Sequence, residues 1–299
     1  MTRMTDLAHL SPDSRQIALL SVEQRLLEID RPHWIGYPKA KEILDELQSL
    51  LNKHARPRMP NLLIVGDSNN GKTTIIERFF ELCGQPSVDE SGDPVKPVIV
   101  AQAPPKPDEK ELYMAILERF WTPYRPTDST AKLRYQLIHL MRLCRVRMLV
   151  IDEMHSMLAG PAIKQREVMN SLKLLCNELR IPVVGVGTRE AVQILHTDPQ
   201  HASRFDVATL PLWASNVDFQ RLLASFEKVL PLRSPSQLSS QMLAAKLHAF
   251  SGGNLGNLHR LLQACAATAL KSGKEHIDAE IIEANQWIRP TRGIRERFA

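Results

Sequence analysis

The sequence predicts an α/β fold in which helices flank a parallel sheet, followed by a small all-helical domain. Short apolar runs alternate with helical patterns between positions 61 and 186, and such alternation builds parallel βαβ units. The first of these runs ends in a glycine-containing loop that leads directly into a helical pattern. After Trp213 the strand-like runs stop and only helical periodicity continues.

The N-terminal residues carry two helical patterns. Apolar side chains recur at helical spacing over residues 14–29 and again over residues 39–51. We therefore expect one amphipathic helix within an N-terminal arm, residues 1–30, and a second helix that leads into the α/β core.

The core alternates strands with helices. The run 61–66 is apolar without polar alternation, which is typical of a strand buried on both faces of a parallel sheet. The expected strands are 61–66, 97–101, 147–151, 181–186 and 207–210. The expected helices between them are 73–83, 109–120, 132–143 and 163–180.

The C-terminal part is expected to be helical. Gly252 and Gly273 stand where helix C-caps belong, next to helical patterns over 216–230, 237–250, 255–271 and 278–287. The expected organisation is an arm (1–30), an α/β core (31–212), a helical domain (213–288) and a basic tail (289–299).

Composition excludes several classes of protein. Hydrophobic residues make up 43% and charged residues 24% of the 299 residues, which excludes disordered and fibrous chains. No apolar run is long enough for a spanning helix, and the N-terminal residues lack the apolar stretch of a signal peptide. Four scattered cysteines favour a reducing, cytoplasmic setting. The net charge of +5 permits a polyanionic partner without requiring one.

The strongest functional signal is a GxxxxGK[ST] motif, Gly66-Asp-Ser-Asn-Asn-Gly71-Lys72-Thr73. It follows a predicted strand and opens a predicted helix, which is the context this motif needs. Backbone N–H groups of such a loop converge on phosphate oxygens at the helix N-terminus. A lysine at this place contacts the β- and γ-phosphates, and the hydroxyl that follows binds Mg²⁺.

A second signal is a buried strand that ends in two consecutive carboxylates, Asp152 and Glu153. Buried carboxylates are costly unless a cation or a reacting water needs them. We expect Asp152 to hold Mg²⁺ through its water shell and Glu153 to orient and deprotonate the attacking water.

Two further residues follow the core strands. Thr188 stands at the carboxyl end of a strand, where ligands bind in open α/β sheets, and it also suits the N-cap of residues 189–195; the two roles are compatible. Arg204 precedes the last core strand and is either a surface arginine or a residue that stabilises charge on a neighbouring subunit's nucleotide.

In this order the motifs resemble an AAA+ P-loop ATPase with a helical lid, over roughly residues 31–288. Narrower phrases resemble the TniB transposition ATPases, which are related to the TnsC regulators and more distantly to IstB. These phrases are His33-Trp-Ile-Gly-Tyr-Pro38, Asp152-Glu-Met-His155 with Leu158, 172–179 followed by Ile181-Pro182, Gly187-Thr-Arg-Glu-Ala191, Leu230-Pro-Leu-Arg233 and Ser251-Gly-Gly253.

The resemblance assigns roles to matching residues. It implies ATP and Mg²⁺ as cofactors, a Walker B pair at Asp152 and Glu153, sensor 1 at Thr188 and a trans-acting arginine finger at Arg204. The implied nucleotide contacts are Gly66, Asp67, Ser68, Asn69, Asn70, Gly71, Lys72, Thr73, Thr74, Ile35 and Tyr37, and the implied metal ligands are Thr73 and Asp152. Ile35 and Tyr37 would border adenine or simply pack at a domain edge.

One position departs from the AAA+ pattern. Many AAA+ lids carry an arginine at the start of a lid helix that reaches the nucleotide, and the matching position here is Gly256. Arg260, one turn later, either takes the place of this arginine or leaves the sensor 2 position unfilled.

The resemblance also implies partners: double-stranded DNA, a transposase, a target-site adaptor and other copies of the chain, in a hexameric ring or a helical filament, with no membrane. The candidate DNA contacts are Lys106, Lys110, Thr130, Lys132 and Arg134, since amines and hydroxyls bind phosphates without reading sequence. Each of these residues equally suits a solvated helix face. The basic tail either docks the transposase or adaptor or is a solvated end.

The implied function is an ATP-dependent, DNA-binding regulator of transposition that assembles on target DNA and recruits the transposase. The alternative is a helicase-loader or replication-initiator ATPase. A signalling NTPase switch that acts without DNA is a third class, but such switches usually carry long sensor repeats, for which this chain has no room. A metabolite kinase is disfavoured because Glu153 suits water activation better than an alcohol acceptor.

Overall fold

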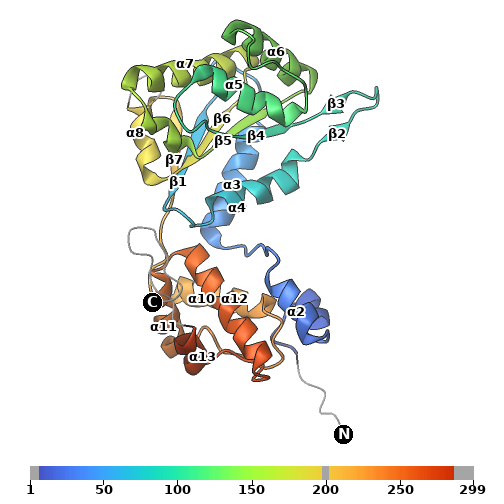
Figure 1. Cartoon of the computed structure of the whole chain (residues 1–299), viewed down its shortest axis with the longest axis vertical. Coiled ribbons are helices and arrows are strands. Elements are labelled where there is room, and N and C mark those ends of the chain that lie inside the picture. Colours follow the sequence, from blue (N-terminus) through green and yellow to red (C-terminus); the bar gives the residue numbers. More distant parts are fainter. Residues whose placement is uncertain (1–6, 197–201, 286–299) are drawn as a thin grey trace. The chain divides into compact units, whose positions relative to one another are not determined.

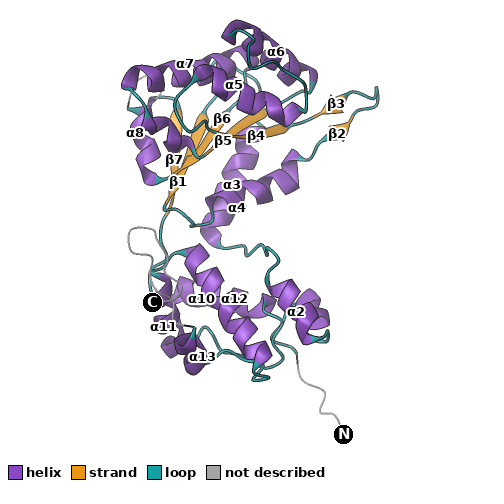
Figure 2. Cartoon of the chain, in the orientation of Figure 1, coloured by secondary structure: helices purple, strands orange, loops and turns teal. Residues whose placement is uncertain are grey.

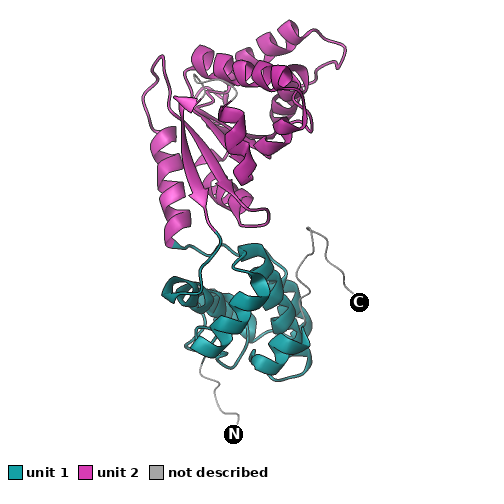
Figure 3. Ribbon diagram, turned by 90° about the vertical axis from the view of Figure 1, so that its left-hand side faces the viewer, with its two compact units in different colours: residues 1–37, 212–299 teal, residues 38–211 magenta. Residues whose placement is uncertain are grey.

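The computed structural model describes residues 7–196 and 202–285. The chain divides into two compact units, Pro38–Pro211 and a second unit made of Met1–Tyr37 with Leu212–Ala299 (Figure 3). Within the described residues, no helix is both long and apolar enough to cross a membrane.

The unit Pro38–Pro211 is built on a five-stranded parallel sheet with the strand order β4-β5-β6-β1-β7 (Figures 1 and 2). The strands are β1 (Asn61–Gly66), β4 (Val98–Gln102), β5 (Met148–Asp152), β6 (Val183–Gly187) and β7 (Phe205–Leu210). All six residues of β1 are buried, as the unbroken apolar run predicts for a central strand covered on both faces. The predicted parallel α/β sheet is therefore confirmed.

Helices cover both faces of this sheet (Figure 1). On one face α5 (Glu109–Leu117), α6 (Thr130–Leu143) and α7 (Ala162–Leu179) share an apolar cluster with alternate residues of the strands, such as Leu63 and Leu149. On the other face lies α4 (Lys72–Phe79), which contacts β1 and β6, and α3 (Pro38–Leu51) packs against α4. The remaining short elements are η1 (Phe80–Gly84), η2 (Glu118–Phe120), η3 (Met154–Ala159), η4 (Arg189–Ala191) and α8 (Val192–Leu195).

A small hairpin, β2 (Ser87–Val88) with β3 (Pro94–Val95), projects between α4 and β4 (Figure 2). The sequence analysis did not predict it, because two-residue strands are too short to show a periodicity. Asp89 in its turn forms an ion pair with Arg145 (2.5 Å), which ties the hairpin to the residues before β5.

The second unit is all-helical. It contains α1 (Pro12–Ala18), α2 (Val22–Ile29), α10 (Val217–Val229), α11 (Gln241–Ser251), α12 (Leu255–Lys271) and α13 (Ala279–Ala284). The predicted arm and the predicted helical domain thus lie in one unit, although the sequence analysis treated them as separate segments. Residues 31–37, assigned to the core from the sequence, lie in this helical unit as well.

Two helix boundaries in this unit differ from the sequence predictions. The single helix predicted over 14–29 is wrong, because Ser21 begins a new helix by a capping box with Gln24 and splits the segment into α1 and α2. The helix predicted from residue 237 begins at Gln241, since the Glu227 carboxylate accepts backbone N–H groups of residues 236–238 and holds them in a turn. Part of the predicted helix 278–287 and the whole tail lie outside the described residues.

Candidate nucleotide site

The GxxxxGK[ST] loop joins the carboxyl end of β1 to the first residue of α4. Gly71 stands at the N-cap of α4 with a φ of 85°, a left-handed conformation that glycine adopts without the steric penalty of a side chain. Asn70, which is 2% exposed, anchors the loop by donating its side-chain amide to the carbonyls of Leu210 (3.2 Å) and Pro211 (3.0 Å). The loop is therefore held at the carboxyl edge of the sheet, where parallel folds bind ligands.

Lys72 lies buried within this loop. Its Nζ donates to the carbonyls of Gly66 (3.0 Å) and Asp67 (2.8 Å). The residue is 6% exposed. Burial lowers the pKa of Lys72, while the carboxylates of Glu153, Asp152 and Asp67 oppose this shift. A buried cation at a helix N-terminus, surrounded by loop N–H groups, suits the phosphates of a nucleotide.

Thr73 and Asp152 come together from different strand ends. The Thr73 hydroxyl donates to Asp152 Oδ2 over 2.9 Å, and Asp152 Oδ1 accepts the backbone N–H of Glu153 at 2.7 Å. A hydroxyl beside a carboxylate is the oxygen-rich pair that Mg²⁺ uses together with substrate phosphates. The residues present therefore fit Mg²⁺ held jointly by the protein and a nucleotide.

Glu153 follows Asp152 directly, at the start of η3. Its backbone is left-handed with a φ of 55°, which turns the chain sharply at the end of β5. Its Oε2 lies 3.3 Å from Nε2 of His155, and both side chains are partly exposed. A partly exposed carboxylate beside the phosphate loop can reach a water molecule.

The residues after β6 contact both His155 and the phosphate loop. The Thr188 N–H donates to Nδ1 of His155 at 3.4 Å. Thr188 occupies the N-cap position of η4, but its side chain makes no capping hydrogen bond there. Hydrogen bonding from the Thr188 hydroxyl lowers the pKa of Glu190. Arg189 of η4 forms an ion pair with Asp67 at 3.0 Å, so this arginine contacts the phosphate loop of its own chain.

Arg204 lies at the opposite edge of the sheet. Its carbonyl accepts the N–H of Asn61 at the amino end of β1, and its Nη1 donates to Asn177 of α7 at 2.8 Å. Six strand residues separate this edge from the loop, or roughly 20 Å at the usual rise of a strand. Arg204 is therefore remote from the nucleotide site of its own unit, as a finger that acts on a neighbour must be.

The two residues predicted to border adenine belong to the helical unit. Tyr37 is 7% exposed and packs edge-on against Trp213, with ring centroids 5.1 Å apart; burial raises its pKa to about 12. The adenine role of Tyr37 stays a prediction.

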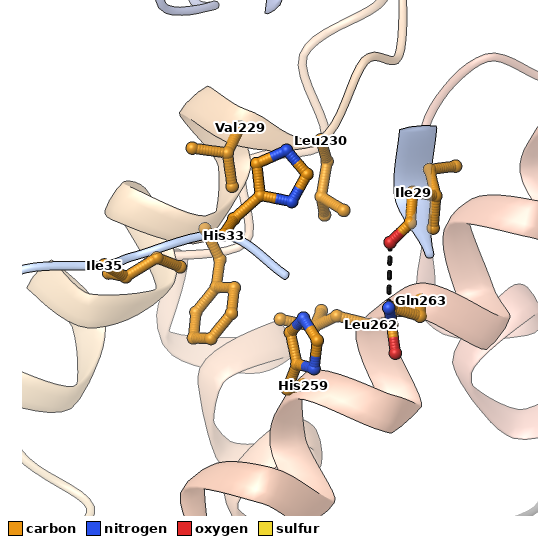
Figure 4. A pocket seen from close by; sticks show the side chains of 9 residues that line it. Ile29, His33, Ile35, Val229, Leu230, His259, Leu262 and Gln263 are labelled. Carbon is orange, nitrogen blue, oxygen red and sulfur yellow. Dashed lines mark hydrogen bonds between the residues drawn. The ribbon is translucent and has the colours of Figure 1, made fainter. Parts of the chain in front are cut away.

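Ile35 lines a small pocket of the helical unit with His33 and His259 (Figure 4). The pocket measures about 10 Å³, room for one water molecule, and the Gln263 side chain closes one side by donating to the Ile29 carbonyl at 2.8 Å. This pocket is too small for an adenine ring and is therefore not the adenine site. Whether Ile35 borders adenine elsewhere stays a prediction.

The predicted DNA contacts gather on two neighbouring helices and the loop before them. Lys106 is exposed after β4, Lys110 lies in the first turn of α5, and the other three lie on α6: Thr130, Lys132 and Arg134. Lys132 forms an ion pair with Asp128 at 2.9 Å, yet its side chain remains 61% exposed.

His155 is the site residue that the sequence analysis did not assign. It appeared there only within the Asp152-Glu-Met-His155 phrase. Its contact with Glu153 lies within one turn, whereas its contact with Thr188 depends on two strands meeting in space. Gly256 is the second residue of α12, so this position offers no side chain toward a nucleotide, and Arg260 lies one turn further along the same helix.

Comparisons with known proteins match this geometry. The curated ClpL protein of Lactococcus lactis subsp. lactis, an ATP-dependent Clp protease ATP-binding subunit, is 25% identical over 150 residues, which cover 49% of this chain and 18% of ClpL. The chain thus spans less than a fifth of the length of that relative.

Among solved structures, the ORC2 protein of Aeropyrum pernix in its ADPNP-ADP complexes matches with a TM-score of 0.61 and 15% identity, over 86% of this chain and 70% of that one. The Aeropyrum pernix ORC1 protein in complex with DNA matches with a TM-score of 0.57 and 17% identity, over 87% and 68%. These similarities establish the AAA+ P-loop fold.

The model of the family described as bacterial TniB protein matches residues 25–215, more than half of the chain. This match spans the phosphate loop, the two carboxylates after β5 and the residues that follow β6. The chain therefore belongs to the TniB family and is an AAA+ ATPase of that type.

Proposed function

We propose that the protein hydrolyses ATP to ADP and phosphate with Mg²⁺, and uses this cycle to regulate DNA transposition. The observation that carries the ATPase proposal is the convergence of Lys72, Thr73, Asp152 and Glu153 at the carboxyl ends of β1 and β5. One buried cation, one hydroxyl and two carboxylates at the end of a phosphate loop match the needs of phosphoryl transfer.

Each side chain takes one role in this proposal. Lys72 and the loop N–H groups bind the β- and γ-phosphates, and Thr73 with Asp152 would hold Mg²⁺, which when bound neutralises charge on the phosphates. Glu153 takes a proton from a water molecule as the water oxygen bonds to the γ-phosphorus. The bond between that phosphorus and the β–γ bridging oxygen breaks, and ADP leaves with both electrons of this bond.

The DNA part of the proposal is supported by three observations. The chain belongs to the TniB family, a solved AAA+ neighbour is a complex with DNA, and five amine or hydroxyl side chains gather around α5 and α6. We infer that copies of the chain assemble on duplex DNA when ATP is bound, and that this assembly recruits a transposase and a target-site adaptor. Arg204 would complete the nucleotide site of the adjacent copy.

A second candidate is a helicase-loader or replication-initiator ATPase. The structural similarity to ORC proteins favours it, because that fold covers 86% of this chain. Both candidates use the same nucleotide site, so they differ only in the partner that the assembled protein recruits.

The test measures ATP hydrolysis with and without duplex DNA for the parent, Lys72→Ala and Glu153→Gln. We expect Lys72→Ala to lose ATP binding, because the loop loses its phosphate-binding cation. Glu153→Gln should keep ATP bound, lose hydrolysis and stay assembled on DNA. Parent-rate hydrolysis by Glu153→Gln would refute the base assignment, and a parent rate that DNA does not change would count against both DNA-dependent candidates.

The second experiment separates the two candidates. A pull-down from the Glu153→Gln assembly on DNA is probed for a transposase and for a replicative helicase. Capture of the transposase supports the transposition role, and capture of the helicase alone supports the loader.

A further inference from the structure

The turn after Asp152 packs on two glycines of β6. Gly185 and Gly187 are two residues apart in a strand, so both face the same side of the sheet. A Cβ at Gly185 would lie 2.3 Å from Met154 Sδ, and one at Gly187 would lie 3.2 Å from the His155 backbone nitrogen. The absence of these two side chains therefore makes room for Met154, which is fully buried, and for the His155 ring.

The contact with Thr188 indicates which nitrogen of the His155 ring carries the proton. The Thr188 N–H donates to Nδ1 of His155 (3.4 Å), so Nδ1 carries no proton and the neutral ring bears its proton on Nε2. Nε2, the ring nitrogen that bears the proton, lies 3.3 Å from Oε2 of Glu153, within ion-pair distance of this carboxylate. A single imidazole thus connects the end of β6 to the carboxylate after β5.

This connection matters because a glutamate side chain is flexible. Without a partner the carboxylate samples many rotamers, and ordering the side chain costs conformational entropy. The ring holds Oε2 and leaves Oε1 as the oxygen that accepts a proton from water. Gly187 leaves space for the ring, since a Cβ at this position would lie 3.4 Å from Nδ1.

We propose that His155 is a positioning residue that orients Glu153 for proton abstraction and connects it to the residues that follow β6. This inference rests on the proposed function, in which Glu153 is the general base. His155 itself touches neither nucleotide nor water in this role and acts through the carboxylate.

Three substitutions distinguish the contact of the ring with Glu153 from its contact with Thr188. His155→Ala removes both contacts. In His155→Gln the amide nitrogen lies as many bonds from Cβ as Nε2 does, so it can still donate to Glu153. In His155→Asn the amide oxygen replaces Nδ1 as the acceptor for Thr188, but nothing reaches Glu153.

We expect kcat of His155→Ala to fall by about 10- to 100-fold, the loss typical when a supporting group is removed from a reacting one. His155→Gln should recover most of this loss, whereas His155→Asn should remain as slow as His155→Ala. KM for ATP and the Kd of a fluorescent ATP analogue should change by less than about twofold in all three, because the phosphate loop is untouched.

Two controls keep the outcome clear. Glu153→Gln tests the proposed function alone, so parent-rate hydrolysis in that variant overturns the function rather than the positioning role. If Glu153→Gln is inactive while His155→Ala retains the parent's kcat, the positioning inference is overturned.

If thermal unfolding shows that His155→Ala does not fold, the test compares kcat of His155→Gln with kcat of His155→Asn. Equal kcat in folded His155→Gln and His155→Asn overturns the inference, and faster hydrolysis by the glutamine variant supports it. Adding His155→Asn to Glu153→Gln should slow the residual hydrolysis no further, since both substitutions act on one carboxylate.

Discussion

At the residue scale, the helical unit depends on a buried ion pair. Arg25 is fully buried on α2, and its guanidinium donates to Glu275 Oε1 (2.8 Å) and to the Pro231 carbonyl (2.9 Å). Burial raises the pKa of Glu275, but the hydrogen bonds from Arg25 and from the Arg233 N–H outweigh burial, so the net shift is downward. An N-terminal helix and the loop before α13 are thereby fastened together.

Replacing Glu275 should destabilise the protein more than replacing Arg25. Glu275→Gln leaves the charge of Arg25 buried without a counter-charge, so we expect the free energy of unfolding to fall by about 3 kcal/mol or more. Arg25→Met removes the buried charge and leaves a carboxylate that is partly exposed, and should cost about 1–3 kcal/mol. Urea unfolding of the full chain, followed by circular dichroism, measures both.

The pH dependence provides the control. Because the pKa of Glu275 is lower in the folded state, its contribution to stability is present above its unfolded pKa and is lost as pH falls through the folded value. The difference between the parent and Glu275→Gln should therefore shrink as pH drops below about 4.5, near the unfolded pKa. A difference that stays constant down to this range would contradict the ion-pair account.

At the element scale, β6 determines where the turn after β5 lies. Met154 is fully buried against Gly185, and the same Cβ position would also approach Leu63 Cδ1 at 2.8 Å. The Val-Gly-Val-Gly pattern is thus a packing surface as well as a strand. It links the strand that ends at Gly187 with the turn that carries Glu153.

Gly185→Ala should therefore overpack the core. We expect it to lower the free energy of unfolding by about 1–3 kcal/mol, because the new methyl group displaces Met154 and Leu63 from their positions. Urea unfolding measures this loss, and kcat should fall with it because the displaced turn carries Glu153.

Met154→Ala supplies the matched control. This change leaves a cavity by itself, but in the double variant the new methyl group occupies part of the freed space. The double variant should then be less destabilised than the sum of the two single variants. Strict additivity would show that Gly185 and Met154 do not meet.

At the scale of the whole molecule, Arg204 lies far from the phosphate loop of its own chain. It lies at the amino edge of the sheet, beside Asn177 of α7, whereas its own phosphate loop lies at the carboxyl edge. We therefore propose that Arg204 stabilises transition-state charge in the site of another subunit.

Mixing two inactive variants tests this arrangement. Arg204→Ala retains the phosphate loop and Lys72→Ala retains the arginine, so mixed interfaces should restore part of the hydrolysis that each variant lacks alone. Sedimentation on DNA with an ATP analogue checks that the two variants assemble together. A mixture that assembles but remains inactive would remove Arg204 from the finger role.

Binding to DNA should depend on phosphate contacts rather than on sequence. Lys106→Ala and Lys132→Ala should each weaken binding on unrelated duplexes alike and reduce the salt dependence of log K by about one unit. Titrations at several salt concentrations measure both. Lys39→Ala is the matched control, since Lys39 pairs with Glu42 at 2.7 Å much as Lys132 pairs with Asp128, but lies on α3. An equal effect at Lys39 would indicate a nonspecific charge effect.

The sequence by itself determined the order in which strands and helices follow one another along the core, and it determined the residues of the phosphate loop. These features are local: the unbroken apolar run of β1 and the spacing of Gly66, Gly71 and Lys72 are visible within one stretch of chain. The helix α12 was predicted with its observed bounds for the same reason, since Asn254 caps it and its apolar side chains recur at helical spacing.

Only the tertiary structure decided which distant residues meet. The union of α1 and α2 with the helical unit depends on Arg25 reaching Glu275, 250 residues later. The contact of His155 with Thr188 depends on β5 and β6 being neighbours in the sheet. Such contacts leave no periodicity in the sequence, because burial and hydrogen bonding act between segments whose separation along the chain is arbitrary.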